Sequence, residues 1–154
     1  LLAVNKNDIS EIKNLSKKIR KDILNMALSA GASSSHFGGS LSTVEILSTL
    51  YKKFLKFDVS YPVWKERDRF ILSKGHGAPI LFQVLAERNF FDSDLLKTAG
   101  QDGSFFHEHP PKPGYVPGIE AATGSLGHGF PIALGMALAG KINKKSYRTT
   151  CEIY

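Results

Sequence analysis

The segments FILSKGHGAP, at positions 70–79, and ATGSLGHG, at positions 122–129, decide the fold that we expect for this chain. In each segment an apolar stretch runs into a glycine-bearing turn that contains a histidine, and an apolar helical pattern follows. An α/β protein presents free backbone amides to an anion at such helix starts. Both segments therefore indicate loops that bind a phosphate or a phosphorylated cofactor.

The first segment predicts a strand, a turn and a helix in that order. The apolar run Phe70–Leu72 is typical of a buried parallel strand, and residues 78–88 have helical apolar spacing with Pro79 in the first turn. His76 lies in the turn between them. Ligands of open parallel sheets bind beyond the carboxyl ends of the strands, so we expect His76 to contact a ligand. The alternative is a histidine with a purely structural role.

The second segment predicts the same arrangement. Residues 119–128 repeat the strand and the turn, and residues 131–140 follow as a helix rich in small residues. Small residues permit close backbone approach, either to a neighbouring element or to a ligand, and the sequence leaves both open. Residues 147–154 indicate the start of a further buried strand. We expect one α/β domain over residues 1–154, a parallel sheet flanked by helices, with fewer strands than a complete sheet has.

Two capping boxes predict where the N-terminal helices begin. Asp8 with Glu11 starts a helix that ends at Gly31, and Ser42 with Glu45 starts another. The intervening residues 33–40 are too polar and too rich in glycine to continue either helix, so we expect a loop that holds His36. A histidine held between two packed helices suits catalysis. The alternative is that His36 is a surface histidine of the loop without a catalytic role.

Residues 100–118 predict a long ordered connection, because four glycines and four prolines break regular structure while aromatic residues favour packing. His107 and His109 alternate around Glu108 in this loop. A metal-binding pair is conceivable there, but the sequence offers no third ligand nearby, so we expect no metal site within this chain.

Composition narrows the class of protein. The chain has 154 residues, a formal net charge of +6 and one cysteine. It has no apolar run of membrane-spanning length and no signal-peptide pattern, so we expect a cytoplasmic protein without a membrane partner. The lone Cys151 fits a reducing compartment. The basic clusters at 17–21 and 141–148 are interpreted as solvated helix surfaces rather than a nucleic-acid interface.

Four ordered motifs resemble the N-terminal part of transketolases over nearly the whole chain, from about Lys18 to Arg148. They are SHFGGSLS at 35–42, DRFILSKGH at 68–76, His109-Pro110 followed by PGIE at 117–120, and TGSLG at 123–127. Four motifs at family-like separations are more specific than any one of them. The chain looks most similar to the short N-terminal subunits of split transketolases.

This resemblance implies an enzyme that uses thiamine diphosphate and a divalent metal, Mg²⁺ or Ca²⁺, to move a two-carbon ketol unit from a ketose phosphate to an aldose phosphate. It implies that His76 contacts the cofactor diphosphate and that His36 and His109 face the substrate. It also implies that the cofactor is contacted by Gly124, Ser125, Leu126 and His128. Partners implied are sugar phosphates and a complementary C-terminal half, in a homo- or hetero-oligomer.

Two departures from the family pattern qualify these expectations. His128 stands where many members have glutamine, and the family's metal-binding Gly-Asp-Gly segment is missing, since Asp102-Gly103 lies in the wrong region. We therefore expect the metal ligands beyond Tyr154 and an activating glutamate from another domain, so the chain is expected to be a fragment or a sequence with missing segments, and inactive by itself. Two alternatives stay open: a deoxyxylulose phosphate synthase-like enzyme, and a degenerate homologue that only binds a partner.

Overall fold

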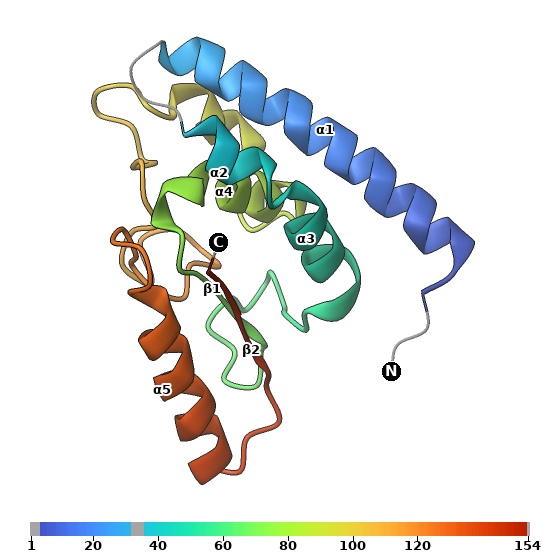
Figure 1. Ribbon diagram of the computed structural model, residues 1–154, viewed down its shortest axis with the longest axis vertical. Helices are drawn as coiled ribbons and strands as arrows, with labels where there is room; N and C mark the ends of the chain where they lie inside the picture. The colour runs from blue at the N-terminus through green and yellow to red at the C-terminus, as the bar shows by residue number, and fades with distance from the viewer. Residues whose placement is uncertain (1–3, 32–35, 154) are drawn as a thin grey trace.

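The computed structural model describes residues 4–31 and 36–153. Its elements in chain order are α1 (Lys6–Ala30), α2 (Phe37–Leu41), α3 (Val44–Thr49), the π-helix η1 (Leu50–Phe54), β1 (Arg69–Leu72), the 3₁₀ turn η2 (Gly75–Gly77), α4 (Ala78–Glu87), the 3₁₀ helix η3 (Ser93–Thr98), α5 (Gly129–Ile142) and β2 (Thr149–Glu152). Figure 1 shows the sheet between two helical layers, with α5 on one side and α1 to α4 on the other.

The two strands pair in parallel, with Phe70 opposite Thr150 and Leu72 opposite Glu152. This arrangement confirms the predicted α/β class, the strand predicted at Phe70–Leu72 and a strand within residues 147–154. The strand predicted at 119–123 is wrong, because residues 119–124 form no regular structure. Instead of a backbone ladder, the Thr123 hydroxyl donates a hydrogen bond to the Leu72 carbonyl oxygen at 2.6 Å. A side-chain bond of this kind ties the segment to the end of β1 without extending the sheet.

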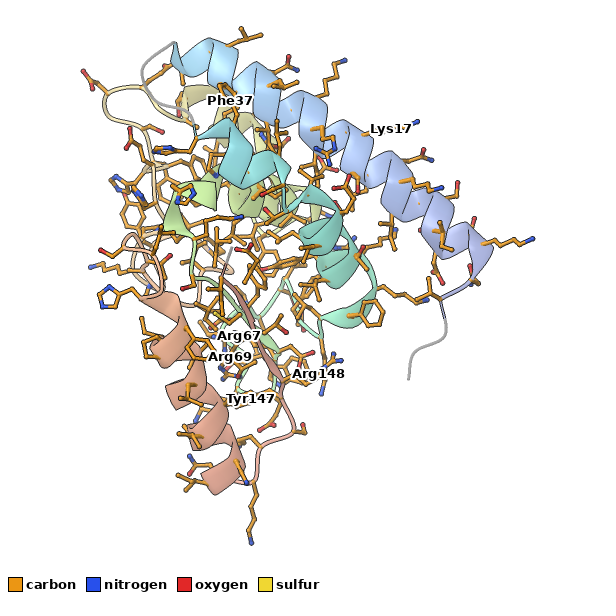
Figure 2. The ribbon with its side chains drawn as sticks, viewed as in Figure 1. Lys17, Phe37, Arg67, Arg69, Tyr147 and Arg148 are labelled. Carbon is orange, nitrogen blue, oxygen red and sulfur yellow. The ribbon has the colours of Figure 1, made fainter. Side chains whose placement is uncertain are left out.

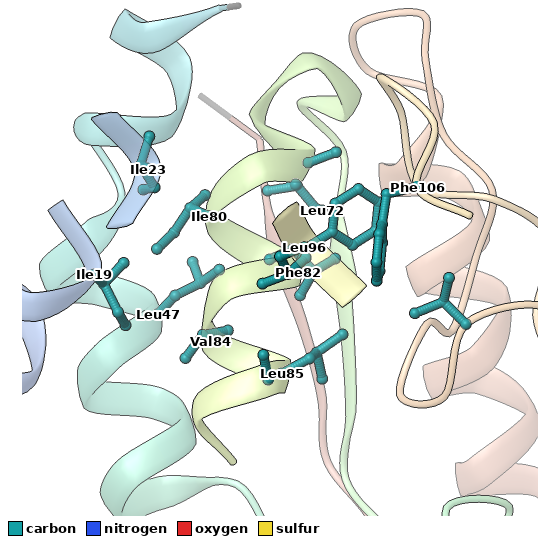
Figure 3. Packing of buried hydrophobic residues seen from close by; sticks show 14 of the residues in the cluster. Ile19, Ile23, Leu47, Leu72, Ile80, Phe82, Val84, Leu85, Leu96 and Phe106 are labelled. Atoms are coloured by element: carbon teal, nitrogen blue, oxygen red, sulfur yellow. The ribbon is translucent and has the colours of Figure 1, made fainter. Parts of the chain in front are cut away.

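The main hydrophobic core surrounds α4. This helix follows η2 directly, and all of its residues from Ile80 to Ala86 are buried. Figure 3 shows Ile80 and Val84 facing Ile19 and Leu47, which come from α1 and α3. Alternation along β1 sends Ile71 to the opposite face of the sheet. A smaller cluster forms there with Ala121 and with Ala133 of α5, together with the partly buried residues Ile132, Met136 and Cys151.

The first helix begins one turn earlier than the sequence predicts. Asn5 is its N-cap, and the capping box joins Asn5 to Asp8, each side chain accepting a hydrogen bond from the other residue's amide at 2.9 Å. Glu11, predicted to complete the box, pairs with Lys52 at 2.8 Å instead. The predicted end is confirmed, since Gly31 is the C-cap with a φ of 81° that favours glycine.

The second predicted capping box is absent from the structure. Helix α3 begins at Val44, and its N-cap Thr43 makes no side-chain capping bond. Ser42 donates its hydroxyl to the Gly39 carbonyl oxygen, and Glu45 pairs with Arg20 of α1 at 2.5 Å. The loop predicted at 33–40 is also wrong in its second half, where α2 begins at Phe37. Residues 32–35 lie outside the described residues.

A network of charged and aromatic side chains fixes the amino ends of both strands. Figure 2 shows Arg67, Arg69, Tyr147 and Arg148 gathered there, and the Arg69 guanidinium lies 3.6 Å from the centre of the Tyr147 ring. The Arg148 side chain donates to Asp68, the residue directly before β1. With the amino ends fixed in this way, the carboxyl ends of the strands meet the loops that contain the histidines.

Within the described residues, no helix has the length and apolar character that crossing a membrane requires.

Candidate functional site

Three histidines from separate segments meet at the carboxyl end of β1. His36 is the N-cap of α2, His76 lies in η2, and His109 lies in the long connection between η3 and α5. The rings of His36 and His76 meet edge to face, with centroids 5.3 Å apart. The Cδ2 atom of His109 is 3.8 Å from the point where a β-carbon on Gly124 would stand. The structure thus brings both sequence motifs and the loop to one place.

His76 is the electrostatic centre of this group. Burial lowers the pKa of the His76 imidazole below its usual value, and positive charge on His36, Lys74 and His109 lowers this pKa further. The ring is therefore predominantly neutral near pH 7, with one N–H donor and one acceptor nitrogen. A neutral imidazole at the end of a parallel strand suits hydrogen bonding to an anionic ligand.

Glycines allow the segments to approach so closely. A β-carbon on Gly75 would stand 2.8 Å from the Cα and N atoms of Gly124, and one on Gly39 would stand 2.6 Å from Cδ2 of His76. Both distances are shorter than a β-carbon contact allows. Gly39 and Gly75 are site residues that sequence reasoning did not single out. The signal for them is a glycine inside each histidine motif, since only a residue without a β-carbon permits such close approach, to the His76 ring at Gly39 and to the Gly124 backbone at Gly75.

The segment that follows Gly124 is open to solvent. Ser125, Leu126 and His128 are exposed, and the Leu126 side chain retains 70% of its accessible surface. His128 is the N-cap of α5 and makes no side-chain capping bond. The exposed turn before α5 therefore leaves Ser125, Leu126 and His128 accessible to a ligand or to another polypeptide.

A buried ion pair lies behind η2. The Lys74 ammonium is 3.1 Å from Oε1 of Glu152 at the end of β2, and it donates a hydrogen bond to the Ser42 hydroxyl at 3.2 Å. Burial raises the pKa of Glu152, and Lys74 opposes this change. Sequence reasoning missed this pair, although two charges within apolar strand ends are a visible signal.

The loop histidine His107 lies on the surface. His107 and Glu108 are exposed, and the His107 ring is tilted by 39° against the Tyr115 ring, with centroids 5.6 Å apart. Across residues 4–31 and 36–153, no three side chains of His, Cys, Asp or Glu gather in a way that suits a metal ion.

Comparison with known proteins shows the family to which the chain belongs. A family model described as the transketolase thiamine diphosphate-binding domain matches residues 12–153. The chain belongs to the transketolase family. The resemblance and the fold expected from the four motifs are therefore confirmed.

Individual members of the transketolase family give the same result. The 6-deoxy-6-sulfo-D-fructose transketolase subunit of Clostridium sp. is 48% identical over 104 residues, which are 68% of this chain and 38% of that protein. An apulose-4-phosphate transketolase subunit of Phocaeicola vulgatus is 38% identical over 134 residues, 87% of this chain and 46% of that protein. The chain spans less than half of either relative.

A solved transketolase has the same fold in this region. The enzyme from Leishmania mexicana superposes with a TM-score of 0.77 at 31% identity, covering 83% of this chain and 19% of that one. The chain therefore matches the family's thiamine diphosphate-binding domain in sequence and the transketolase fold over the region that it covers.

Proposed function

We propose that this chain supplies diphosphate and substrate contacts for thiamine diphosphate-dependent ketol transfer from a ketose phosphate to an aldose phosphate. The observation that carries the proposal is the meeting of His36, His76 and His109 beside Gly124 at the carboxyl end of β1. The family match supplies the cofactor class. Transketolase relatives favour this activity over that of a deoxyxylulose phosphate synthase.

The residues present fit a diphosphate. Gly39 and Gly75 carry no β-carbon, so the His76 imidazole and the backbone of both motifs lie close together at the carboxyl end of the sheet. We propose that neutral His76 donates a hydrogen bond to the diphosphate. The half-buried Gly124 and the exposed Ser125 and Leu126, with His128 after them, are proposed to line the rest of the cofactor. When bound, the thiazolium ring provides the electron sink for the reaction.

His36 and His109 are proposed to act on the substrate. They flank His76 from two other segments, and an imidazole exchanges protons near neutral pH. In ketol transfer, protons move to and from sugar oxygens, and negative charge develops on those oxygens. Two histidines at the mouth of the site are suited to donate to these oxygens and to accept protons from them.

The proposal assigns other parts of the reaction to other polypeptide. We propose that Mg²⁺ or Ca²⁺ is held by residues outside this chain; the described residues offer no set of three metal ligands. Two relatives are named as subunits. We propose a complementary transketolase half as the partner, in a cytoplasmic assembly to which residues 1–154 contribute the N-terminal part of one domain.

Calorimetric titration tests the cofactor assignment. The chain is titrated with thiamine diphosphate and magnesium, with and without the complementary half, and we expect tight binding only in the assembly. Turnover is then compared between a ketose phosphate and 6-deoxy-6-sulfo-D-fructose, because one relative is named for the latter sugar. An assembly that binds no thiamine diphosphate would refute the proposal and favour a homologue that only binds a partner.

A further inference from the structure

A continuous set of polar contacts runs from the end of β2 to the histidine group. Glu152 pairs with Lys74 at 3.1 Å, and Lys74 donates to the Ser42 hydroxyl at 3.2 Å. Ser42 in turn donates to the Gly39 carbonyl oxygen at 3.1 Å. Gly39 lies against the His76 ring: a β-carbon added to Gly39 would stand only 2.6 Å from Cδ2 of His76. Four contacts thus join the sheet, η2 and α2.

Stability alone does not account for the charges in this set. The Lys74 and Glu152 side chains keep 6% and 7% of their accessible surface. Apart from the ion pair, the carboxylate of Glu152 accepts no hydrogen bond from the described residues. Desolvation of both groups offsets most of their attraction, and a well-packed apolar pair is often at least as stable. The ion pair instead fixes positions, because the Lys74 ammonium contacts both Glu152 and Ser42 and so holds these two residues relative to each other.

Contacts from other elements hold α2: Arg20 of α1 donates to the Leu41 carbonyl oxygen at 3.1 Å, and Lys74 donates to Ser42. Helix α2 has five residues, and its N-cap makes no side-chain capping bond, so the helix has little stability of its own. It nevertheless carries His36 at its start and Gly39 in its middle, both in contact with His76. Ser42 follows directly at its C-terminal end and is the point where Lys74 holds it.

We propose that Lys74 is a positioning residue that holds α2 against η2 through Ser42, and so sets His36 and Gly39 against His76, with Glu152 as its counter-charge. The consequence for cofactor and substrate rests on the proposed function. The proposed position of α2 against η2 concerns this chain alone and needs no bound ligand.

The experiment uses a double variant, Lys74→Met with Glu152→Met, in the full chain. Removing one partner would leave a buried charge unpaired, whereas removing both leaves an apolar pair, so we expect an unfolding temperature close to that of the unmodified chain. We expect the nuclear Overhauser contact between the His36 and His76 rings to be lost. In the assembly, affinity for thiamine diphosphate should fall about tenfold, the scale of one charge-assisted hydrogen bond.

A matched control removes another largely buried pair, Arg67 with Glu120, whose Nη2 and Oε2 atoms are 2.6 Å apart at the other end of the sheet. Arg67→Met with Glu120→Met should keep the contact between the two histidines. If the Lys74 and Glu152 double variant folds and also keeps that contact, the ion pair is structural only and the proposal is overturned. If the double variant does not fold, Ser42→Ala decides, since it leaves the ion pair in place and removes the hydroxyl that joins Lys74 to α2 and to the Gly39 carbonyl oxygen. Loss of the contact supports the proposal, and an unchanged contact overturns it.

Failure of the proposed function is a separate result. An unmodified assembly that binds no thiamine diphosphate would refute the cofactor role, while the contact between His36 and His76 is measured without cofactor.

Discussion

Gly75 and Gly124 meet backbone to backbone at the carboxyl end of β1, and a β-carbon on Gly75 would stand 2.8 Å from the Cα and N atoms of Gly124. Each glycine belongs to one of the two histidine-bearing motifs, which are separated by about a third of the chain. Backbone atoms do not move aside as the tip of a side chain does. The contact therefore determines how closely the two cofactor-binding segments approach each other.

Gly75→Ala should separate the two segments. Overpacking of a tight contact costs about 1–3 kcal/mol, so we expect a lower free energy of unfolding and weaker binding of thiamine diphosphate in the assembly. Gly124→Ala is the matched control for stability, since a β-carbon there would meet only Cδ2 of His109 at an ordinary 3.8 Å. Chemical denaturation measures both variants. Equal stability of the two variants would contradict the role of the contact.

His76→Ala should weaken cofactor affinity in the assembled enzyme by about tenfold or more, because a hydrogen bond to a charged group contributes about 1.5–3 kcal/mol. Calorimetric titration measures the affinity. His107→Ala is the control, because His107 is exposed and contacts Tyr115 rather than the other histidines. A His76 variant that binds thiamine diphosphate as tightly as the His107 variant would remove His76 from the cofactor site.

His36→Ala and His109→Ala should each lower turnover by about a hundredfold, the scale of one lost proton-transfer or oxyanion partner. Affinity for thiamine diphosphate should stay near normal, because both residues are assigned to the substrate. Steady-state kinetics and titration of the same samples separate the two effects. A parallel loss of turnover and cofactor affinity would reassign these histidines to cofactor binding or to structure.

The sequence predicts the position of His76 because that position follows from short-range chemistry. The apolar run, the glycine turn and Pro79 predict a strand, a turn and a helix over residues 70–88, and the structure has β1, η2 and α4 in that order. The convergence of His36 and His109 on His76 depends on contacts between distant segments. Only the family resemblance placed these histidines in one site.

Errors in the sequence interpretation arise where tertiary contacts compete with local signals. Ser42 and Glu45 have capping-box spacing, but Lys74 and Arg20 take those side chains as partners. The apolar spacing at 119–123 is typical of a strand, yet a Thr123 side-chain bond replaces backbone pairing there. Local pattern does not reveal such partners, because they come from other elements of the fold.

The isolated chain should show no ketol transfer. Two strands are present in the described residues, fewer than the usual four to six, and no set of three metal ligands gathers there. Purified chain is incubated with thiamine diphosphate, magnesium and a ketose phosphate, and product formation is measured with and without the complementary half. Measurable turnover by the chain alone would show that residues 1–154 hold a complete site.

Asp68→Asn should destabilise the fold at neutral pH, because Asp68 joins the starts of both strands. Its carboxylate accepts from the Arg148 amide at 2.7 Å, from the Arg148 side chain at 2.5 Å and from the Lys56 amide at 2.9 Å. Burial alone would raise the pKa of Asp68, but these hydrogen bonds and the Arg148 charge lower it below 3.8. The cost should be about 2 kcal/mol, within the range for hydrogen bonds to a charged group.

The lowered pKa of Asp68 also sets the direction of a pH effect. The unfolded chain binds the proton more readily than the folded chain, so this stabilisation is complete above about pH 4 and is lost as the pH falls through the folded-state pKa. Denaturation at several pH values should show the Asp68→Asn chain losing less stability on acidification than the unmodified chain. Asp102→Asn, in the exposed long connection, is the control and should follow the unmodified chain. Parallel pH profiles for the Asp68→Asn and unmodified chains would show that the carboxylate of Asp68 does not hold the strand starts together.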